Sequence, residues 1–342
     1  MKKILVTGGL GYIGSHTVVK LMMKNYNVSI IDNLSNSEIF ILENIEKITG
    51  RKPNFFNVDL TDYNKTNSCF TKKNYDGVIH FAAFKSVSES VEYPEKYYSN
   101  NLNSLLNILR CMKENKVDNI VFSSSCTVYG QPDDLPVSEK FPFKEAESPY
   151  ARTKQISENI IKDFVNSISF LSGISLRYFN PVGAHHSGLI GELPIGIPDN
   201  LVPYITQTAA GIRKELQIFG DDYDTHDGTA IRDYIHVEDL AEAHIAALER
   251  MCENKMDSEY EYYNVGTGVG YSVLDVVKSF ERVNKLKLNY SVIERRNGDI
   301  EKIFSDCRIS NKKLGWATKK GLDEMMSSSW KWQNNISSFL KG

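Results

Sequence analysis

Short, almost continuously apolar runs alternate with amphipathic stretches through the first half of the chain. Residues 2–9, 27–33, 53–60, 76–84 and 118–125 form runs with the length of buried strands. Residues 14–26 have the apolar spacing of a helix, and polar or amphipathic stretches separate the later runs. This alternation predicts a parallel sheet wrapped by helices.

The pattern becomes irregular beyond about residue 180. Residues 181–200 and 220–230 are loop-like, and a predicted helix follows at 272–284. The aromatic-rich segment at 330–340 is predicted to be a packed terminal helix. We therefore expect a first unit at 1–180 and a smaller second unit at 181–342, with later segments free to return to the first sheet.

Composition describes an ordinary folded chain. Of its 342 residues, 41% are hydrophobic and 24% are charged. Forty basic and 43 acidic residues leave a net charge of -3, which argues against a general nucleic-acid or membrane-surface binder. The start of the chain has no signal-peptide core, and no later apolar run nears the roughly 18 residues of a membrane span, so we expect a cytoplasmic protein.

Cysteine and histidine positions predict neither a disulfide framework nor a metal site. The five cysteines are scattered and include no Cys-x-x-Cys pair. His185 and His186 are adjacent in a glycine-rich loop, without a cysteine or carboxylate at ligand spacing. No metal is therefore expected.

A glycine-rich stretch, TGGLGYIG at residues 7–14, follows the first predicted strand and opens the first helix. Gly8, Gly11 and Gly14 would serve a tight turn, the approach of the backbone to a pyrophosphate, and close helix–strand packing. Alone, the pattern also fits an ordinary strand-turn-helix corner. Asp32, at the end of the second strand, favours the dinucleotide interpretation because its carboxylate can accept hydrogen bonds from ribose hydroxyls. Since residues 33–40 contain no Arg or Lys, the sequence predicts NAD rather than NADP.

Tyr150 and Lys154 stand four positions apart, directly after a Ser-Pro pair that can start a helix. On one helix face, the ammonium can stabilise a phenolate. Lowering a tyrosine pKa from 10 to near 7 requires roughly 4 kcal/mol of stabilisation. A positively charged nicotinamide ring can supply part of that stabilisation beside the ammonium. Alone, a surface Tyr/Lys pair is an equally good explanation. Ser125 favours function, because it follows a strand at the edge where doubly wound sheets bind ligands.

Motifs along nearly the whole chain resemble the extended short-chain dehydrogenase/reductase family, and within it the enzymes that epimerise sugar nucleotides. They are TGGLGYIG, SSSCTVYG, SPYARTK, LRYFNPVGAH, GIPDNLVPYI, RDYIHVEDLA and GVGYSVLDVV. The resemblance implies an α/β fold, in which a doubly wound parallel Rossmann sheet binds NAD and a smaller mixed α/β C-terminal domain binds a UDP-sugar. It also implies a homodimer through helices around residues 90–115 and 150–168.

The resemblance assigns site residues position by position. Tyr150 matches the catalytic base, Lys154 the residue that lowers its pKa and binds the nicotinamide ribose, and Ser125 the hydroxyl-binding serine. Besides Tyr150 and Lys154, the positions that hold NAD are matched by Gly8, Gly11, Tyr12, Ile13, Asp32, Asn33, Asp59, Leu60, Phe81, Ala82, Lys85, Asn100, Ser123 and Tyr178. The positions that hold the UDP-sugar are matched by Lys85, Ser125, Tyr150, Asn180, Asn200, Leu201, Arg232, Arg296, Asp299 and Ile303.

These assignments imply reversible inversion at C4 of a UDP-hexose. Tyr150 would take the proton of the 4-hydroxyl while hydride moves to NAD, and the 4-keto ring would turn over before both return. Arg232 and Arg296 would hold the diphosphate meanwhile, because a guanidinium matches phosphate oxygens. Ile303 is smaller than the tyrosine that some relatives carry, so N-acetylated UDP-hexosamines are expected as further substrates.

Other function classes stay open at this point. A related 4,6-dehydratase would need acid/base carboxylates beside the active serine, where this chain has Cys126 and Thr127. A non-catalytic NAD-binding regulatory protein would have no need of Ser125, Tyr150 and Lys154. An NADP-dependent reductase is disfavoured by Asp32.

Overall fold

The computed structural model of the chain describes residues 1–71, 73–295 and 300–339. Its centre is a seven-stranded sheet with the strand order β3-β2-β1-β4-β5-β6-β10, in which all neighbours are parallel. The strands are β1 (Lys3–Thr7), β2 (Asn27–Asp32), β3 (Asn54–Asn57), β4 (Gly77–His80), β5 (Asn119–Ser123), β6 (Ser172–Tyr178) and β10 (Tyr260–Val265). This is the order of a doubly wound dinucleotide-binding sheet, and the predicted fold class is confirmed.

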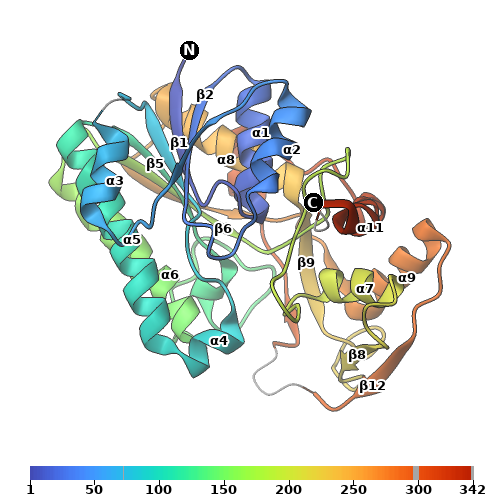
Figure 1. Ribbon diagram of the computed structural model, residues 1–342. Coiled ribbons are helices and arrows are strands. Elements are labelled where there is room, and N and C mark those ends of the chain that lie inside the picture. Colours follow the sequence, from blue (N-terminus) through green and yellow to red (C-terminus); the bar gives the residue numbers. More distant parts are fainter. Residues whose placement is uncertain (72, 296–299, 340–342) are drawn as a thin grey trace.

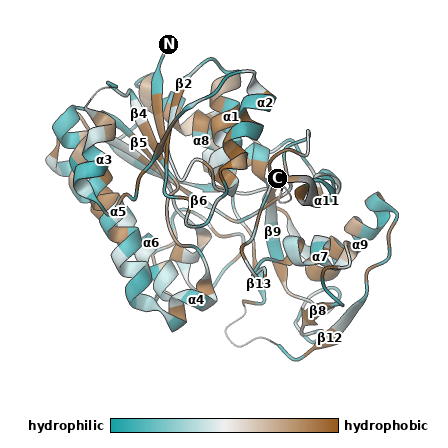
Figure 2. Ribbon diagram, in the orientation of Figure 1, coloured by the Kyte–Doolittle hydropathy of each residue, from teal (hydrophilic) through white to brown (hydrophobic). Residues whose placement is uncertain are grey.

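Helices cover both faces of this sheet (Figure 1). One face packs against α1 (Tyr12–Met23), α2 (Phe40–Thr49) and α8 (Val237–Cys252); the other packs against α3 (Tyr63–Phe70), α5 (Pro94–Asn115) and α6 (Pro149–Ser167). The short helix α4 (Val87–Glu92) precedes α5. Figure 2 shows hydrophobic residues along the central strands, α1 and α8, whereas hydrophilic and hydrophobic stretches alternate along α3, α5 and α6.

The alternation of side chains along β1 explains why its sequence is apolar throughout. Ile4 and Val6 are fully buried in the core beneath α1, while Leu5 between them is fully buried in the core beneath α5. Successive side chains of a strand point to opposite faces, so a strand covered on both sides needs no polar position.

The second unit is built on a mixed sheet. It contains β7 (Asn180–Val182), β9 (Ile231–His236), β11 (Gly270–Ser272) and β13 (Lys302–Ile303), with β11 antiparallel to β9. A separate pair joins β8 (Leu216–Phe219) to β12 (Tyr290–Ile293). Its helices are α7 (Leu201–Ala209), α9 (Val273–Asn284) and α11 (Leu322–Phe339), whereas α10 (Arg308–Leu314) packs against α8 and β10.

Three later elements, β10, α8 and α10, lie on the first unit. β10 pairs in parallel with β6, and α8 packs on the core that contains β1 and β4. The chain therefore passes between the units more than once, while the division at residue 180 stays a prediction. Residues 330–339 of the aromatic-rich segment lie in α11, where the Trp330 ring meets Phe280 edge-on, at 5.8 Å between ring centroids.

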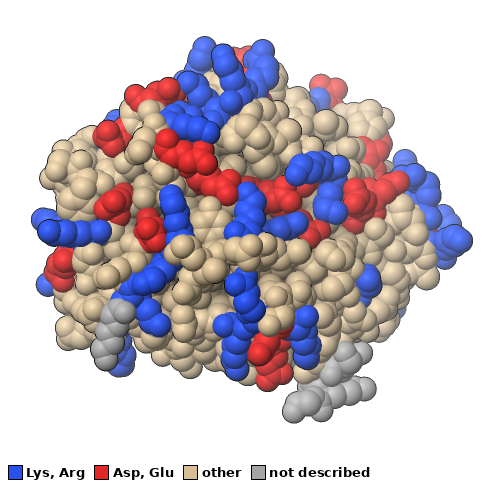
Figure 3. Space-filling view, turned by 90° about the horizontal axis from the view of Figure 1, so that it is seen from above, with Lys and Arg blue, Asp and Glu red and all other residues tan. Residues whose placement is uncertain are grey.

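Basic and acidic side chains are interspersed on the face drawn in Figure 3, as the nearly balanced composition suggests. Across residues 1–71, 73–295 and 300–339, no helix combines the length and apolar character needed to span a bilayer. The five cysteines are free thiols.

The first helix approaches the glycine turn so closely that its third residue must lack a side chain. Gly8 adopts a φ of +66°, which glycine reaches without strain. A Cβ added to Gly14 would lie 2.1 Å from the Gly8 carbonyl oxygen. The sequence-based role of Gly14 in close packing therefore has a direct steric basis.

We expect Gly14→Ala to lower the free energy of unfolding by about 1–3 kcal/mol or more, because its methyl group would overlap the Gly8 carbonyl. Gly321→Ala is the matched control, since nothing lies within 4 Å of a Cβ added there. Urea unfolding measures both variants. Equal stability of Gly14→Ala and the natural protein would show that the turn can relax.

Candidate active site

The residues predicted to bind NAD gather at one edge of the central sheet. Because all seven strands are parallel, their carboxyl ends meet at this edge. Strand ends and the residues directly after them supply Gly8, Asp32, Asp59, Leu60, Phe81, Ala82, Ser123 and Tyr178. Folding thus brings together residues that are far apart in the sequence.

Asp32 ties the glycine turn to the end of β2. Its carboxylate accepts hydrogen bonds from the backbone N–H groups of Leu10 (3.0 Å) and Leu34 (3.0 Å) and from the Ser37 hydroxyl (2.8 Å). A carboxylate offers about four acceptor positions, so capacity remains for a ribose hydroxyl. Gly11 caps α1 and has no side chain, which leaves the first-turn N–H groups of the helix available to a phosphate. The residues present fit a dinucleotide.

Other predicted NAD residues hold neighbouring loops together. The Asn33 amide donates to Asp59 (3.2 Å), and the Phe81 N–H donates to the Thr7 carbonyl (3.1 Å). The Tyr12 hydroxyl donates to the Gly183 carbonyl (2.6 Å), which joins α1 to the loop after β7. Ile13 follows in α1 and packs against the core, and Asn100 lies in α5, where its amide donates to Asn101 (3.0 Å).

Lys85 and Asn200 both contact Glu192, a residue that the sequence analysis did not identify. Glu192 forms an ion pair with Lys85 (3.0 Å) and accepts a hydrogen bond from the Asn200 amide (2.8 Å). Glu192 therefore links a predicted NAD-binding position to a predicted UDP-sugar position. No spacing rule places Lys85 there, because it belongs to a distant segment, whereas Glu192 and Asn200 share the loop between β7 and α7.

The catalytic candidates lie together where α6 meets the end of β5. The Ser148 hydroxyl caps α6 by accepting from the Ala151 N–H (3.2 Å), with Pro149 in the first turn, as the Ser-Pro pair predicts. The Lys154 ammonium donates to the Ser123 carbonyl (2.6 Å) and lies 5.8 Å from the centroid of the Tyr150 ring. Ser125 lies near enough to Tyr150 for its side chain to favour a lower pKa of the phenol.

Burial controls the protonation of this group. Burial raises the pKa of Tyr150, a negative charge on Tyr178 would raise it further, and the Ser125 side chain opposes both effects. Burial lowers the pKa of Lys154 to about 8, against the attraction of Glu158. Burial is the largest influence on the phenol pKa. The sequence argument added the positive charge of a nicotinamide ring to that of Lys154, and this combination stays a prediction.

Glu158, one helical turn after Lys154, was not identified from the sequence. Its carboxylate accepts from the Ser124 hydroxyl (2.5 Å) and from Nε (3.0 Å) and Nη2 (2.6 Å) of Arg177 on β6. Tyr150, Lys154 and Glu158 follow one another at i, i+4 spacing and meet three consecutive serines of the β5 end. That spacing, with a third ionisable residue on the helix face that carries Tyr150 and Lys154, is the signal that could have found Glu158.

The predicted UDP-sugar residues are organised around β9. Arg232 lies on β9, Asn180 pairs opposite Tyr234 of the same strand, and Ile303 of β13 pairs opposite Arg232. Asn200 caps α7 and Leu201 begins it. Arg296 and Asp299 lie outside the described residues.

The two strands around Arg232 are fixed by its buried neighbour Asp233. This carboxylate accepts from the N–H (2.8 Å) and hydroxyl (2.6 Å) of Thr267 and from the N–H of Ser305 (3.1 Å). Ile303 is 4% exposed and packs with residues of η1 (Cys126–Tyr129), the turn that follows Ser125. Ile303 therefore borders both Arg232 and the catalytic serine segment.

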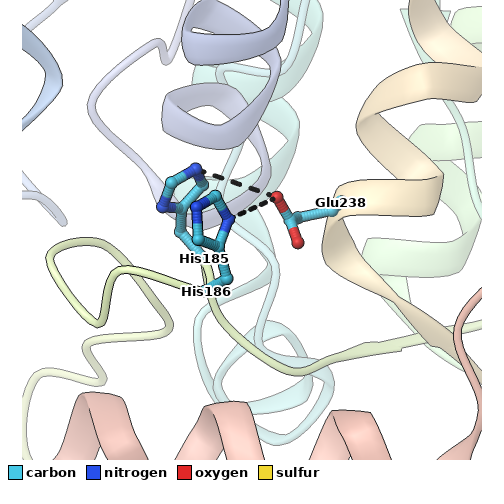
Figure 4. A group of neighbouring side chains, drawn as sticks. All are labelled: His185, His186 and Glu238. Atoms are coloured by element: carbon cyan, nitrogen blue, oxygen red, sulfur yellow. Dashed lines mark ion pairs between the residues drawn. The ribbon is translucent and has the colours of Figure 1, made fainter. Parts of the chain in front are cut away.

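Folding supplies His185 and His186 with a carboxylate that their sequence spacing does not reveal, while the expectation of no metal stays a prediction. A carboxylate oxygen of Glu238, at the start of α8, lies 3.8 Å from Nε2 of His185 and 3.7 Å from Nδ1 of His186 (Figure 4). The sequence analysis looked for a partner at short spacing, whereas folding brings this one from a distant helix.

Comparisons with known proteins agree on one family. The model of the NAD dependent epimerase/dehydratase family matches residues 4–266. A UDP-glucose 4-epimerase of Drosophila melanogaster is 48% identical over 337 residues, which cover 97% of this chain and 96% of that protein.

Solved structures of similar proteins contain the expected ligands. The UDP-glucose-4-epimerase from Stenotrophomonas maltophila, with bound NAD and formylated UDP-arabinopyranose, superposes with a TM-score of 0.96 at 43% identity and covers 99% of this chain and 100% of that one. The UDP-glucose 4-epimerase from Bifidobacterium longum, in complex with NAD⁺ and UDP, has a TM-score of 0.93 at 44% identity, with 98% and 99% covered.

Glu158→Gln should lower the free energy of unfolding by about 3–5 kcal/mol, because the buried Arg177 guanidinium loses its carboxylate partner. Glu261→Gln is the matched control: Glu261 is also buried and held by two nitrogens of Arg250 (2.7 and 2.9 Å). Arg250 keeps its ion pair with Asp257 (3.2 Å), so Glu261→Gln should lower the free energy of unfolding by less than Glu158→Gln does. Chemical denaturation measures the free energy of unfolding of both variants. Equal losses in Glu158→Gln and Glu261→Gln would contradict the role given to Glu158 as the carboxylate partner of Arg177.

Proposed function

The chain belongs to the NAD dependent epimerase/dehydratase family, and we propose that it inverts C4 of UDP-hexoses, interconverting UDP-glucose and UDP-galactose with tightly bound NAD. The observation that carries the proposal is the meeting of Tyr150, Ser125 and Lys154 at the carboxyl edge of a dinucleotide-binding sheet. Similarity over nearly the full length to UDP-glucose 4-epimerases selects the reaction from those that such a site can perform.

Each residue of the catalytic group has a distinct task. Bound NAD supplies a reversible hydride acceptor, so that C4 of the sugar can pass through a keto state. Tyr150, as phenolate, takes the proton of the 4-hydroxyl and later returns it. Ser125 hydrogen-bonds the same oxygen and orients it. Lys154, held by the Ser123 carbonyl, keeps positive charge close to the phenolate.

Inversion requires that the sugar ring turn while the nucleotide stays bound. Arg232, with Arg296, grips the diphosphate, because a guanidinium fork matches phosphate oxygens. Arg232 is well placed for this because Asp233 fixes its strand to β13 and to the turn before β11. The hexose, held less tightly, can then present either face of C4.

The remaining assignments follow the same proposal. NAD is held by Gly8, Gly11, Tyr12, Ile13, Asp32, Asn33, Asp59, Leu60, Phe81, Ala82, Lys85, Asn100, Ser123, Tyr150, Lys154 and Tyr178. The UDP-sugar is held by Lys85, Ser125, Tyr150, Asn180, Asn200, Leu201, Arg232, Arg296, Asp299 and Ile303. Residues 1–180 form the NAD-binding domain, rejoined by β10, α8 and α10, and the remainder of 181–342 forms the UDP-sugar-binding domain.

Elimination of water, the reaction of a 4,6-dehydratase, is disfavoured by the residues beside Ser125. Burial raises the pKa of the Cys126 thiol to about 12, and the Thr127 hydroxyl donates to the Ser125 oxygen (3.0 Å). Neither side chain can replace the carboxylates that such a reaction needs.

The proposal extends to assembly and location. The helices α5 and α6 pack against each other, and Val87, Val91, Tyr93 and Leu106 of α4, α5 and their junction are exposed, which favours a homodimer through this region. The cytoplasm is the proposed compartment, because free thiols persist in reducing surroundings.

Tyr150→Phe should lower turnover by about 10²–10⁴-fold, the loss typical of a missing general base, while NAD stays bound. Tyr290→Phe is the matched control, because Tyr290 lies exposed on β12. Turnover of UDP-galactose and the NAD content of the purified variants are the measurements. Near-normal turnover in Tyr150→Phe would refute the assignment.

The natural protein should also accept UDP-GalNAc, because Ile303 leaves room for a 2-acetamido group. Ile303→Tyr should reduce kcat/KM for UDP-GalNAc relative to UDP-galactose by about 10–200-fold, as expected for one group in an apolar pocket. Ile303→Val, which removes bulk, is the control and should keep the ratio. If the natural protein has no N-acetyl activity, or if the tyrosine leaves the ratio unchanged while UDP-galactose turnover persists, Ile303 does not set this specificity.

A further inference from the structure

A second cluster of ligand-type side chains lies where the loop after β7 meets the start of α8, outside the residues assigned to NAD or UDP-sugar. His185 and His186 project from the loop toward one oxygen of Glu238, at 3.8 and 3.7 Å (Figure 4). The two imidazole rings lie side by side, with 4.1 Å between their centroids. The three ligand atoms lie within 4.8 Å of one another.

His185 holds a buried nitrogen that has no hydrogen-bond partner among the described residues. This atom is Nε2, and His185 as a whole is 2% exposed. Nδ1 of the same ring lies 2.8 Å from the Ser187 hydroxyl oxygen, which also accepts from the Leu189 N–H (3.2 Å). With its proton on Nδ1, donated to Ser187, the ring presents the Nε2 lone pair to the cluster.

The loop supports the other tautomer as well. With the proton on Nε2, Nδ1 accepts from the Ser187 N–H (3.2 Å) instead. A cation would select the first tautomer, because a histidine ligand commonly donates its second ring N–H to an oxygen that orients it. Burial lowers the pKa of His185 to about 4, so the imidazole is neutral near neutral pH.

Glu238 supplies an ionised oxygen. Burial alone would raise its pKa, but the nearby positive charges, with Lys20 the strongest, bring it to about 2. Two imidazoles and one carboxylate are a common donor set for Zn²⁺. Bond lengths of about 2.0–2.2 Å place tetrahedral ligands roughly 3.4 Å apart, so the histidine–carboxylate separations need to shorten by only a few tenths of an ångström.

Two lysines compete for the same carboxylate. Lys20 lies 3.4 Å from one oxygen of Glu238, and Lys320 lies 3.5 Å from the other. Each ammonium has a second carboxylate, Glu242 at 3.3 Å for Lys20 and Glu324 at 3.1 Å for Lys320. A cation can therefore take the oxygen that faces the histidines while both lysines keep a partner, although their charges weaken its binding.

We propose that His185, His186 and Glu238 form a binding site for a borderline divalent cation such as Zn²⁺, with water as the fourth ligand. His186, whose side chain is 72% exposed, provides the entry. The bound ion joins the loop after β7 to α8. The same loop carries Glu192, which contacts Lys85 and Asn200, so the ion stabilises a segment that borders the reaction site.

Within the part of the chain that the structure describes, one further group has suitable distances, His226, Asp227 and Asp275, and its side chains have other partners. Asp275 and Ser272 form the capping box of α9, and the Ser272 hydroxyl donates to Asp227 (2.5 Å). Asp275 thus already caps a helix, and Asp227 already accepts from the capping serine. This group therefore provides a matched control.

Calorimetric titration of the chelator-treated, NAD-containing protein with Zn²⁺ tests the proposal. We expect one Zn²⁺ per chain with a micromolar Kd. His186→Ala should weaken binding at least tenfold, whereas Lys320→Met should tighten it because a competing ammonium is removed. His226→Ala should bind like the natural protein. Titration with Co²⁺ should give the visible absorption of a four-coordinate ion, which His186→Ala should lose.

The outcomes separate the alternatives. Absence of saturable Zn²⁺ binding, or unchanged affinity in His186→Ala, would overturn the proposal. Binding that is lost in His226→Ala but kept in His186→Ala would place the ion at the start of α9 and overturn it equally. These results do not depend on epimerase activity, so they are independent of the function proposed above.

Discussion

The anchoring of α6 against the end of β5 is the interaction on which the candidate site depends. Lys154 donates to the Ser123 carbonyl and Glu158 accepts from the Ser124 hydroxyl, so that Tyr150 comes to lie beside Ser125. Buried charges are costly unless each has partners, and Arg177 satisfies Glu158 through two nitrogens. These hydrogen bonds therefore fix the position of α6 relative to β5, because breaking them would leave an unpaired charge in the core.

The same burial determines the chemistry. It raises the pKa of Tyr150 and lowers that of Lys154, so burial favours the uncharged form of both side chains. A phenolate forms in such surroundings only when further positive charge is present. On the function proposed above, the site would thereby be coupled to the oxidised cofactor: Tyr150, the proposed base, would become effective in the state in which hydride can be accepted.

The substrate half depends on β9 in a comparable way. This strand carries Arg232 and pairs with segments that contain Asn180 and Ile303, while Asp233 binds backbone and hydroxyl groups on two further segments. The residues proposed to bind the substrate come from distant parts of the chain and thus share one rigid support. The loop between β7 and α7 joins the two halves through Gly183, which contacts Tyr12, and Glu192, which contacts Lys85.

Features that depend on neighbours in the chain could be predicted from the sequence. The buried strands, the glycine turn, the start of α6 after Ser148 and the Tyr150–Lys154 face all follow from local spacing and conformational preference. Resemblance to a family then supplied positions that spacing alone could not. Folding decided what depends on distant segments: β10 beside β6, Ile303 beside Arg232, Glu192 between Lys85 and Asn200, and Glu238 beside His185 and His186. It also decided the direction of the Tyr150 pKa, because the energy of a charge depends on how much water surrounds it, and burial is a property of the packed structure rather than of neighbouring residues in the sequence.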